Sequence, residues 1–276
     1  VTMNTATTNY LINAAGTYTQ AAATNAVFNT LEMDSTAGAI TLDLGANAMP
    51  AGGSGAGKAV LFAGSNDITI TGTSAGIGTS ALWFHNYIDP GKALNLNASF
   101  GASNFMIVGG TGTTLYSGQG LSASFIQNGG LFRATANQTV TASMRVNDGG
   151  VFEIGADLNG AGAGDFTHAI GGAAGNILFN GDGGLSAFGA DRVANFGGAG
   201  AEVTWGAGNF LTLNTNTDGD YTFKLSSALS NAMITIQNGI NFNGKTRTVE
   251  VANGSASVDA TLSGALTGGL SGGLVK

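Results

Sequence analysis

Residues 39–44 read Ala-Ile-Thr-Leu-Asp-Leu, residues 67–71 read Asp-Ile-Thr-Ile-Thr, and residues 221–225 read Tyr-Thr-Phe-Lys-Leu. In each stretch apolar and polar side chains alternate, which is typical of a β-strand with one buried face. Clusters of Gly, Asn, Asp, Thr and Ser separate these stretches from their neighbours. Because such residues favour tight turns, the sequence predicts an all-β protein made of many short strands.

The composition favours a folded chain despite its high glycine content. The 276 residues include 47 Gly, no Cys and 9% charged residues, yet 43% are hydrophobic. Average usage would give roughly 20 Gly and about a quarter charged residues. Since disordered chains lack apolar residues at this level, we expect a packed core between the glycine-rich turns.

Further strand candidates recur at a spacing of about 8 to 12 residues, which suits either an antiparallel sandwich or a solenoid. The strands are very short, and residues of one type return at matching inward positions, which favours the solenoid. The candidates are residues 60–62, 68–70, 82–84, 94–96, 105–108, 114–116, 125–126, 131–133, 144–146, 151–154, 177–179, 203–205, 210–213, 221–225, 233–236, 247–251 and 258–262.

Asn-Gly and Asp-Gly pairs recur where each coil of a solenoid would turn. The same pairs also signal two-residue hairpins, so they leave both architectures open. Helical periodicity is not sustained anywhere: Leu185–Phe196 predicts at most a turn or two of helix, and 21–29 is ambiguous. The pairs begin at Asn128, Asp148, Asn180, Asp182, Asn238, Asn243 and Asn253.

The chain contains nothing that resembles a linker between separate cores. Its Gly-rich stretches are short, and Pro50 and Pro90 are the only prolines, so a stiff spacer is excluded. We expect one continuous, elongated β-helix over residues 1–276. At about 4.8 Å per rung and roughly 20 to 25 residues per coil, it would have around a dozen rungs.

Charge and residue usage exclude several classes of partner. The net charge is −7 and the few Lys and Arg residues are scattered, so no basic stripe is present for nucleic acid. No apolar run is long enough to predict a transmembrane helix. The absence of Cys suits an exported protein that is not held together by disulfides. Because the chain begins at Val1 without an initiator Met, we expect a processed product or a piece of a longer protein.

The region 177–276 carries the most specific pattern in the chain. Residues 177–192 read Ile-Leu-Phe-Asn-Gly-Asp-Gly-Gly-Leu-Ser-Ala-Phe-Gly-Ala-Asp-Arg, and residues 240–251 read Ile-Asn-Phe-Asn-Gly-Lys-Thr-Arg-Thr-Val-Glu-Val. Val-Thr-Trp-Gly stands at 203–206 and Leu-Ser-Gly-Ala-Leu-Thr-Gly at 262–268. This region resembles the autotransporter-associated (passenger-associated transport) repeat proteins, which are large surface proteins of Gram-negative bacteria.

The resemblance extends less specifically to residues 31–71 and 81–87. It implies a right-handed parallel β-helix that is exported and displayed on, or released from, the cell surface. One departure is that the strand which usually follows Gly-Leu-Val-Lys in that family is missing after Lys276. The mode of surface anchoring therefore stays open.

Metal-binding candidates are few. Asn214, Asn216, Asp218 and Asp220 alternate oxygen ligands in the manner of a calcium loop. The full loop also needs a bidentate acid at its twelfth position, where Leu225 stands, so we expect a solvated turn with calcium as the alternative. The two histidines, at positions 85 and 168, lack zinc-ligand spacing, and no other metal or cofactor is predicted.

Aromatic residues offer a route to carbohydrate, because the CH-rich faces of sugars can stack on rings. Trp83, Tyr87 and Trp205 are the glycan-stacking candidates. The chain also has 15 Phe, which favours the alternative that most of its rings lie inside the coil.

Carboxylate pairs would be needed for a polysaccharide-degrading enzyme, the third class of function that this architecture suggests. The pairs that the sequence offers lack a catalytic signature, so no catalytic residue is assigned. They are Asp148 with Glu153, Asp182 with Asp191, and Asp218 with Asp220.

The sequence thus predicts a non-enzymatic extracellular structural protein. We expect a subunit or module of a bacterial surface fibre or rod that forms homo-oligomers or filaments through its N- and C-terminal rungs, because the edge strands of a β-helix leave backbone groups unpaired. The alternative is an adhesin-type passenger that binds glycans or cells.

Overall fold

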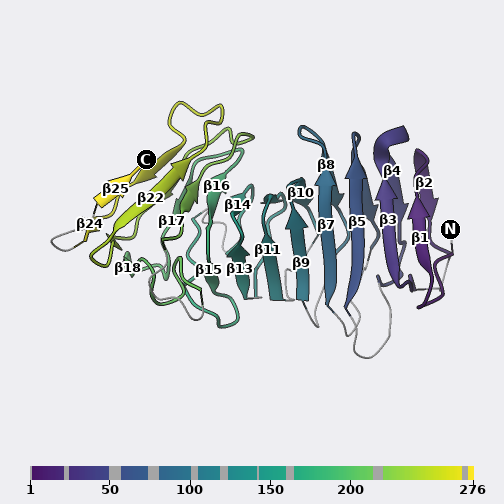
Figure 1. Ribbon diagram of the computed structural model, residues 1–276, viewed down its shortest axis with the longest axis horizontal. Coiled ribbons are helices and arrows are strands. Elements are labelled where there is room, and N and C mark those ends of the chain that lie inside the picture. The colour runs from purple at the N-terminus through teal and green to yellow at the C-terminus, as the bar shows by residue number, and fades with distance from the viewer. Residues whose placement is uncertain are drawn as a thin grey trace. The chain divides into compact units, whose positions relative to one another are not determined.

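The structure is a computed structural model that describes residues 2–21, 25–49, 57–73, 81–100, 105–118, 124–141, 143–159, 165–213, 220–268 and 273–276 (Figure 1). Within these ranges the regular elements are β-strands, apart from one 3-10 turn, η1 (Ser35–Ala37). The chain divides into two compact units, Val1–Ile126 and Gln127–Lys276. Each unit is a parallel β-solenoid, and the expected continuity of a single domain stays a prediction.

In the first unit the chain alternates between two parallel sheets, so that each strand pairs with its counterpart one coil earlier and one coil later. One sheet contains β1 (Asn9–Ile12), β3 (Thr30–Asp34), β5 (Lys58–Gly64), β7 (Leu82–Ile88), β9 (Phe105–Gly110) and β11 (Ser124–Asn128), in that order. The other contains β2 (Gly16–Thr19), β4 (Ile40–Asp43), β6 (Ile68–Thr71), β8 (Ala93–Leu96) and β10 (Thr113–Tyr116).

The alternating stretches of the sequence form the inner wall of this solenoid. Ile40 of β4 pairs in register with Ile68 of β6, and Ile68 pairs with Leu94 of β8. All three side chains are buried. Because neighbouring strands lie about 4.8 Å apart, branched side chains stack directly on one another in the core. The intervening polar residues face outward.

The second unit has four parallel sheets in which short strands follow the same coil-to-coil order. In this unit the first sheet contains β13 (Met144–Asn147) and β15 (Ile177–Asn180). The second sheet contains β12 (Leu131–Ala134), β14 (Gly150–Ile154), β16 (Gly183–Ala187), β19 (Phe223–Leu225), β22 (Thr246–Val251) and β25 (Gly273–Val275), in that order. The third sheet contains β17 (Arg192–Ala194), β20 (Ile234–Ile236) and β23 (Ala260–Leu262), and the fourth contains β18 (Val203–Thr204), β21 (Ile240–Asn241) and β24 (Leu266–Thr267).

The parallel registers decide between the two architectures that the spacing left open. Leu131 of β12 pairs with Val151 of β14, and Gly183 of β16 pairs with Phe223 of β19, both in parallel. A sandwich built from hairpins would pair consecutive strands in antiparallel fashion. The predicted parallel β-helix is therefore confirmed, and its coils differ in length.

The Asp148-Gly149 pair shows how the coil turns its corners. Both residues have positive φ, 51° and 79°, as a type I′ turn requires. The turn joins β13 to β14, which belong to different sheets. The turn prediction is confirmed here, but the turn is a corner of the solenoid and not a hairpin.

Two local predictions are wrong. Leu185–Phe196 contains no helix, because β16 and β17 cross this stretch and the side chains of Leu185 and Ala187 are buried in the core. Residues 210–213 do not form a strand, since Leu211 has a left-handed φ of 53° that interrupts the extended backbone. At Leu185–Phe196 the pairing of neighbouring coils decides the local structure.

Tyr116 gives the first unit a testable dependence on alkaline pH. It lies buried on β10, and burial raises its pKa to about 12, with a backbone hydrogen bond to Phe100 offsetting part of the rise. An unfolded Tyr has a pKa of about 10. The folded pKa is the higher one, so the stability contribution is complete below pH 10 and is lost as the pH rises through 12.

Two pKa units correspond to about 2.7 kcal/mol. We expect the urea midpoint of the native chain to fall more steeply between pH 10 and 12 than that of Tyr116→Phe. Parallel curves for the two proteins would contradict this assignment.

Candidate functional site

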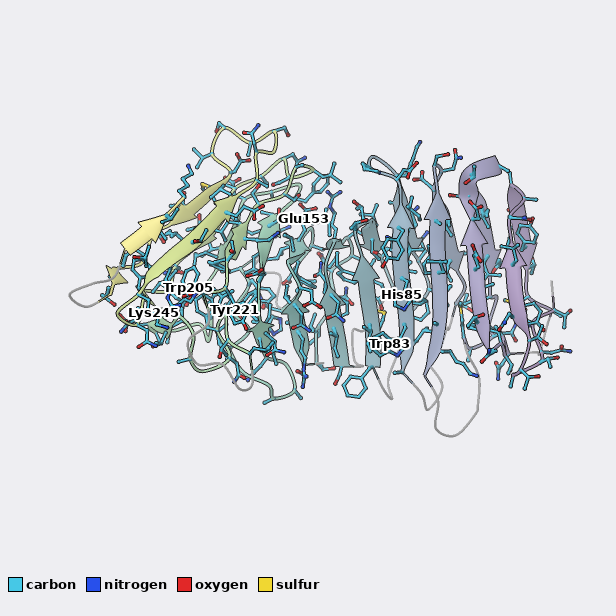
Figure 2. The ribbon with its side chains drawn as sticks, viewed as in Figure 1. Trp83, His85, Glu153, Trp205, Tyr221 and Lys245 are labelled. Carbon is cyan, nitrogen blue, oxygen red and sulfur yellow. The ribbon has the colours of Figure 1, made fainter. Side chains whose placement is uncertain are left out.

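The outer face of β7 presents a row of three rings. Trp83, His85 and Tyr87 occupy alternate positions that face away from the core, while Leu82, Phe84 and Ile88 are buried on the other side. Trp83 is 39% exposed and Tyr87 is 50% exposed. The rings of Trp83 and His85 are stacked, with centroids 6.2 Å apart and an interplanar angle of 11°. Both residues are labelled in Figure 2. We call these three residues the β7 ring row.

Trp83 lies with one edge of its indole close to Gly57. A Cβ added at Gly57 would lie 2.9 Å from the indole Nε1 atom, which is too close for a real contact. Only glycine therefore fits beside the indole in its present position. The indole occupies the space that a Cβ would need, and Trp83 remains 39% exposed.

On one side of the β7 ring row lie β5 and, one strand further, β3. The outward residues of β5 that pair in register with the row are Ala59, Leu61 and Ala63. One strand further, on β3, the corresponding residues are Thr30, Glu32 and Asp34. The sheet thus places rings, a strip with two alanines, and a polar border with two carboxylates side by side.

The carboxylate of Asp34 in this border is fixed by a local turn. Its Oδ1 accepts hydrogen bonds from Thr36 Oγ1 at 2.6 Å and from Thr36 N at 2.9 Å. The side-chain bond and then the backbone bond lower the pKa of Asp34 below its usual value. The border therefore carries a negative charge at neutral pH.

Trp205 is not available for stacking on a ligand. Its side chain is 0% exposed and its Nε1 donates a hydrogen bond to the Tyr221 carbonyl at 3.1 Å. The rings of Trp205 and Phe223 pack in a T-shaped arrangement, with centroids 6.1 Å apart. The guanidinium of Arg247, also buried, lies 5.8 Å from the ring centroid and donates to the Trp205 carbonyl at 3.2 Å. Trp205 is a core residue and cannot stack on a glycan, so its prediction as a glycan-stacking residue is wrong.

Of the four calcium candidates, the structure describes one, Asp220. Asn214, Asn216 and Asp218 fall outside the described residues, and Asp220 is an exposed side chain whose carboxylate lies 3.9 Å from Arg247 Nη1. Within the described ranges, no three His, Cys, Asp or Glu residues gather closely enough to hold a metal ion. The ring of His168 lies between two backbone carbonyls: its Nδ1 is 2.7 Å from the carbonyl oxygen of Gly175, and its Nε2 is 3.3 Å from that of Leu158.

Two of the carboxylates considered for catalysis, Asp182 and Asp191, have structural contacts. Asp182 Oδ1 accepts a hydrogen bond from Thr222 N at 2.7 Å, and Asp191 Oδ1 accepts one from Met233 N at 2.8 Å. In both cases the carboxylate ties one coil to the next. Glu153 is buried and takes part in the network described next.

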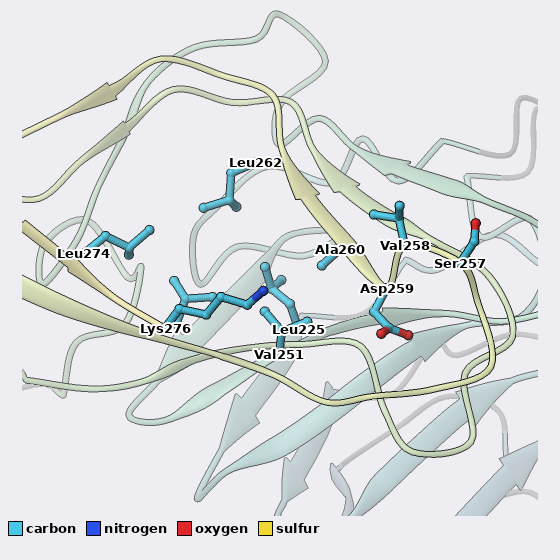
Figure 3. A pocket seen from close by; sticks show the side chains of 10 residues that line it. Leu225, Val251, Ser257, Val258, Asp259, Ala260, Leu262, Leu274 and Lys276 are labelled. Atoms are coloured by element: carbon cyan, nitrogen blue, oxygen red, sulfur yellow. The ribbon is translucent and has the colours of Figure 1, made fainter.

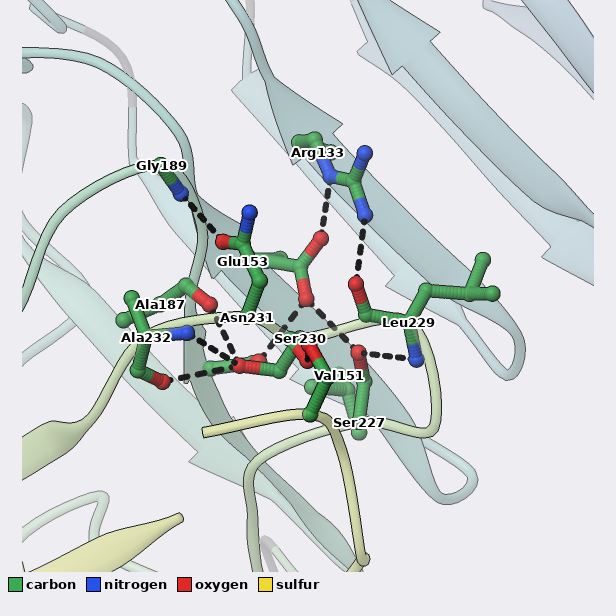
Figure 4. A network of polar contacts seen from close by, with 12 residues as sticks. Arg133, Val151, Glu153, Ala187, Gly189, Ser227, Leu229, Ser230, Asn231 and Ala232 are labelled. Carbon is green, nitrogen blue, oxygen red and sulfur yellow. Dashed lines mark hydrogen bonds and ion pairs between the residues drawn. The ribbon is translucent and has the colours of Figure 1, made fainter. Parts of the chain in front are cut away.

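Arg133, Glu153 and Ser186 form an ion-pair ladder on the outer face of the second unit. They occupy the same register position on β12, β14 and β16. Arg133 Nε donates to Glu153 Oε2 (Figure 4). Ser186 Oγ donates to Glu153 Oε1 at 2.8 Å. Glu153 is 0% exposed although its side chain faces away from the core.

The loop at 226–231 covers this ladder. Ser227 Oγ donates to Glu153 Oε1 at 2.6 Å, and Ser230 Oγ donates to the Ala187 carbonyl at 2.6 Å (Figure 4). We call the ladder together with this loop the clasp. The sequence alone does not reveal the clasp, because its members become neighbours only once the coil register is known.

The C-terminal coil of the second unit has an apolar opening. A cavity of about 390 Å³ lies against β23 and β25, lined chiefly by apolar side chains (Figure 3). β23, β24 and β25 each stand at the end of their sheet. Leu266 and Leu274 on these strands are exposed. In the first unit, β1 and β2 stand at the ends of theirs.

Comparisons of this chain with known proteins found no related protein. No protein-family model matches the chain, and neither a curated protein nor a solved structure matches it. The resemblance of residues 177–276 to the autotransporter-associated repeats therefore stays a prediction. No helix in the described part of the chain is long and apolar enough to cross a membrane.

Proposed function

We propose that this protein is a non-enzymatic structural module of a bacterial extracellular fibre, assembled by end-to-end stacking of terminal coils. The observation that carries the proposal is the C-terminal apolar opening, where the terminal strands β23 and β25 line a cavity of about 390 Å³. The occupant that fits it is the N-terminal coil of a second copy, because β1 and β2 are also terminal strands.

Two physical effects favour such stacking. A terminal strand offers a row of backbone donors and acceptors that another strand can pair with. The exposed Leu266 and Leu274 side chains and the apolar lining of the cavity would leave water at the same time, which stabilises the contact. The absence of Cys and the low content of charged residues are consistent with the proposed export and display at the surface of a Gram-negative cell.

Assembly can be tested by placing charges on the C-terminal edge. We expect the purified native chain to sediment as growing filaments when its concentration is raised, and the Leu266→Lys/Leu274→Lys variant to stay monomeric, because charged edge strands oppose pairing. Tyr87→Lys is the matched control, since it also replaces an exposed large side chain but on β7. Monomeric native protein at high concentration, or filaments formed equally by the edge variant, would contradict the proposal.

A further inference from the structure

We propose that the β7 ring row is a binding site for a neutral polysaccharide. Trp83 and Tyr87 are exposed on one face of one strand, four residues apart. At about 3.3 Å per residue their Cα atoms are roughly 13 Å apart, a span suited to a short stretch of sugar chain. This site is independent of the proposed end-to-end assembly, because it lies on the outer face of the sheet and not at its terminal strands.

The arrangement of the rings suits sugars in particular. A sugar ring has apolar CH faces that pack on aromatic rings and hydroxyl groups around its rim that need hydrogen-bond partners. The β7 ring row supplies both, because the His85 nitrogens and the Tyr87 hydroxyl lie in the same row as the indole. Binding sites for small molecules combine apolar area with a few polar groups in this way.

The strands on one side of β7 leave room for a sugar chain beside the rings, and their charges favour a neutral over an acidic polysaccharide. Ala59 and Ala63 on β5 have small side chains beside the rings. Beyond them the carboxylates of Glu32 and Asp34 can accept hydrogen bonds from hydroxyl groups. The outward residues of β3, β5 and β7 in these registers include two acids and no Lys or Arg, so an acidic polysaccharide would be repelled.

Gly57 acts as a positioning residue in this proposal. Since a Cβ at this position would meet the indole Nε1 at 2.9 Å, Gly57→Ala displaces the ring without removing it. We therefore expect Gly57→Ala to weaken binding while the fluorescence spectrum of Trp83 shifts. If Gly57 had a purely structural role, weaker binding would not be accompanied by a shift in the Trp83 fluorescence spectrum.

The test uses the whole chain with three neutral probes, hydroxyethylcellulose, laminarin and mannan, and with polygalacturonate as the acidic probe. Affinity electrophoresis measures the retardation of the native chain and of its variants. We expect at least one neutral probe to retard the native chain, and Trp83→Ala/Tyr87→Ala to weaken that binding by about tenfold or more, in line with the contribution of two stacked rings.

Leu11→Ala is the matched control, because Leu11 is an exposed apolar residue on β1 of the same sheet. We expect it to bind as the native chain does, and circular dichroism checks that every variant is folded. Three results would overturn the proposal: no retardation by any neutral probe, equal retardation of the ring variant and the native chain, or binding to polygalacturonate alone. None of them bears on filament formation, so the two proposals fail separately.

Discussion

Replacing Glu153 with Leu is expected to lower the free energy of unfolding of the second unit by about 3 to 5 kcal/mol, because it leaves the buried guanidinium of Arg133 without its counter-ion. The same change removes the acceptor for the Ser186 and Ser227 hydroxyls. Each buried hydroxyl that loses its partner adds to the destabilisation. The measurement is the urea midpoint followed by circular dichroism.

Glu250→Gln is the matched control for this experiment. Glu250 Oε2 pairs with Lys224 Nζ at 3.5 Å, and its side chain is 57% exposed. Exposed ion pairs contribute at most about 1 kcal/mol, so we expect little change in the midpoint. A Glu153→Leu midpoint no lower than that of Glu250→Gln would refute the clasp.

The double variant Arg133→Met/Glu153→Leu separates the cost of an unpaired charge from the value of the pair. Replacing both members of a buried ion pair with apolar residues of similar size is often nearly neutral. We expect the double variant to recover most of the stability that Glu153→Leu loses. A double variant as unstable as the single one would assign the effect to the serine contacts and not to the guanidinium.

The second large effect is expected from Trp205→Ala. Removal of a fully buried Trp side chain typically costs about 3 to 5 kcal/mol, because a cavity remains where the indole was. Trp205 packs among Phe210, Phe223 and Phe242, and its Nε1 donates to the Tyr221 carbonyl. We therefore expect a strongly lowered urea midpoint.

The other tryptophan of the chain supplies the control. Trp83→Ala removes a partly exposed side chain from an outer face, so the loss should stay near 1 kcal/mol or less. Acrylamide quenching gives a second test: Trp205 in Trp83→Phe should resist the quencher, and Trp83 in Trp205→Phe should be quenched readily. Equal quenching in the two variants would contradict the different environments of these side chains.

The strands of the fold were predictable from local patterns, and the prediction failed where pairing with other coils decides the backbone. Alternation at 39–44 and 67–71 predicted β4 and β6, because the period of two is a property of each strand alone. At Leu185–Phe196 the run of Leu, Ala and Phe suited a short helix. There the pairing with β14 and β19, which lie in other coils, favoured the extended backbone.

The candidate sites were harder to predict, because exposure depends on which face of a strand a residue occupies. Trp83 and Tyr87 alternate with Leu82, Phe84 and Ile88, so their outward position followed from the sequence once β7 was assigned. Trp205 stands just after the two-residue strand β18, where the alternation gave no such guide. The clasp required the coil register, which no local pattern of the chain contains.

Pairing only with adjacent coils has a consequence for how such a chain can change its length. Lys58 of β5 pairs with Leu82 of β7, and Val60 pairs with Leu31 of β3, so an interior coil touches one predecessor and one successor. Stability in such proteins is approximately a sum of nearest-neighbour terms. Tandem duplication or excision of a whole coil would therefore preserve the remaining ladder. The length of the solenoid along its axis can thus change during evolution in increments of about 4.8 Å, the spacing of one coil.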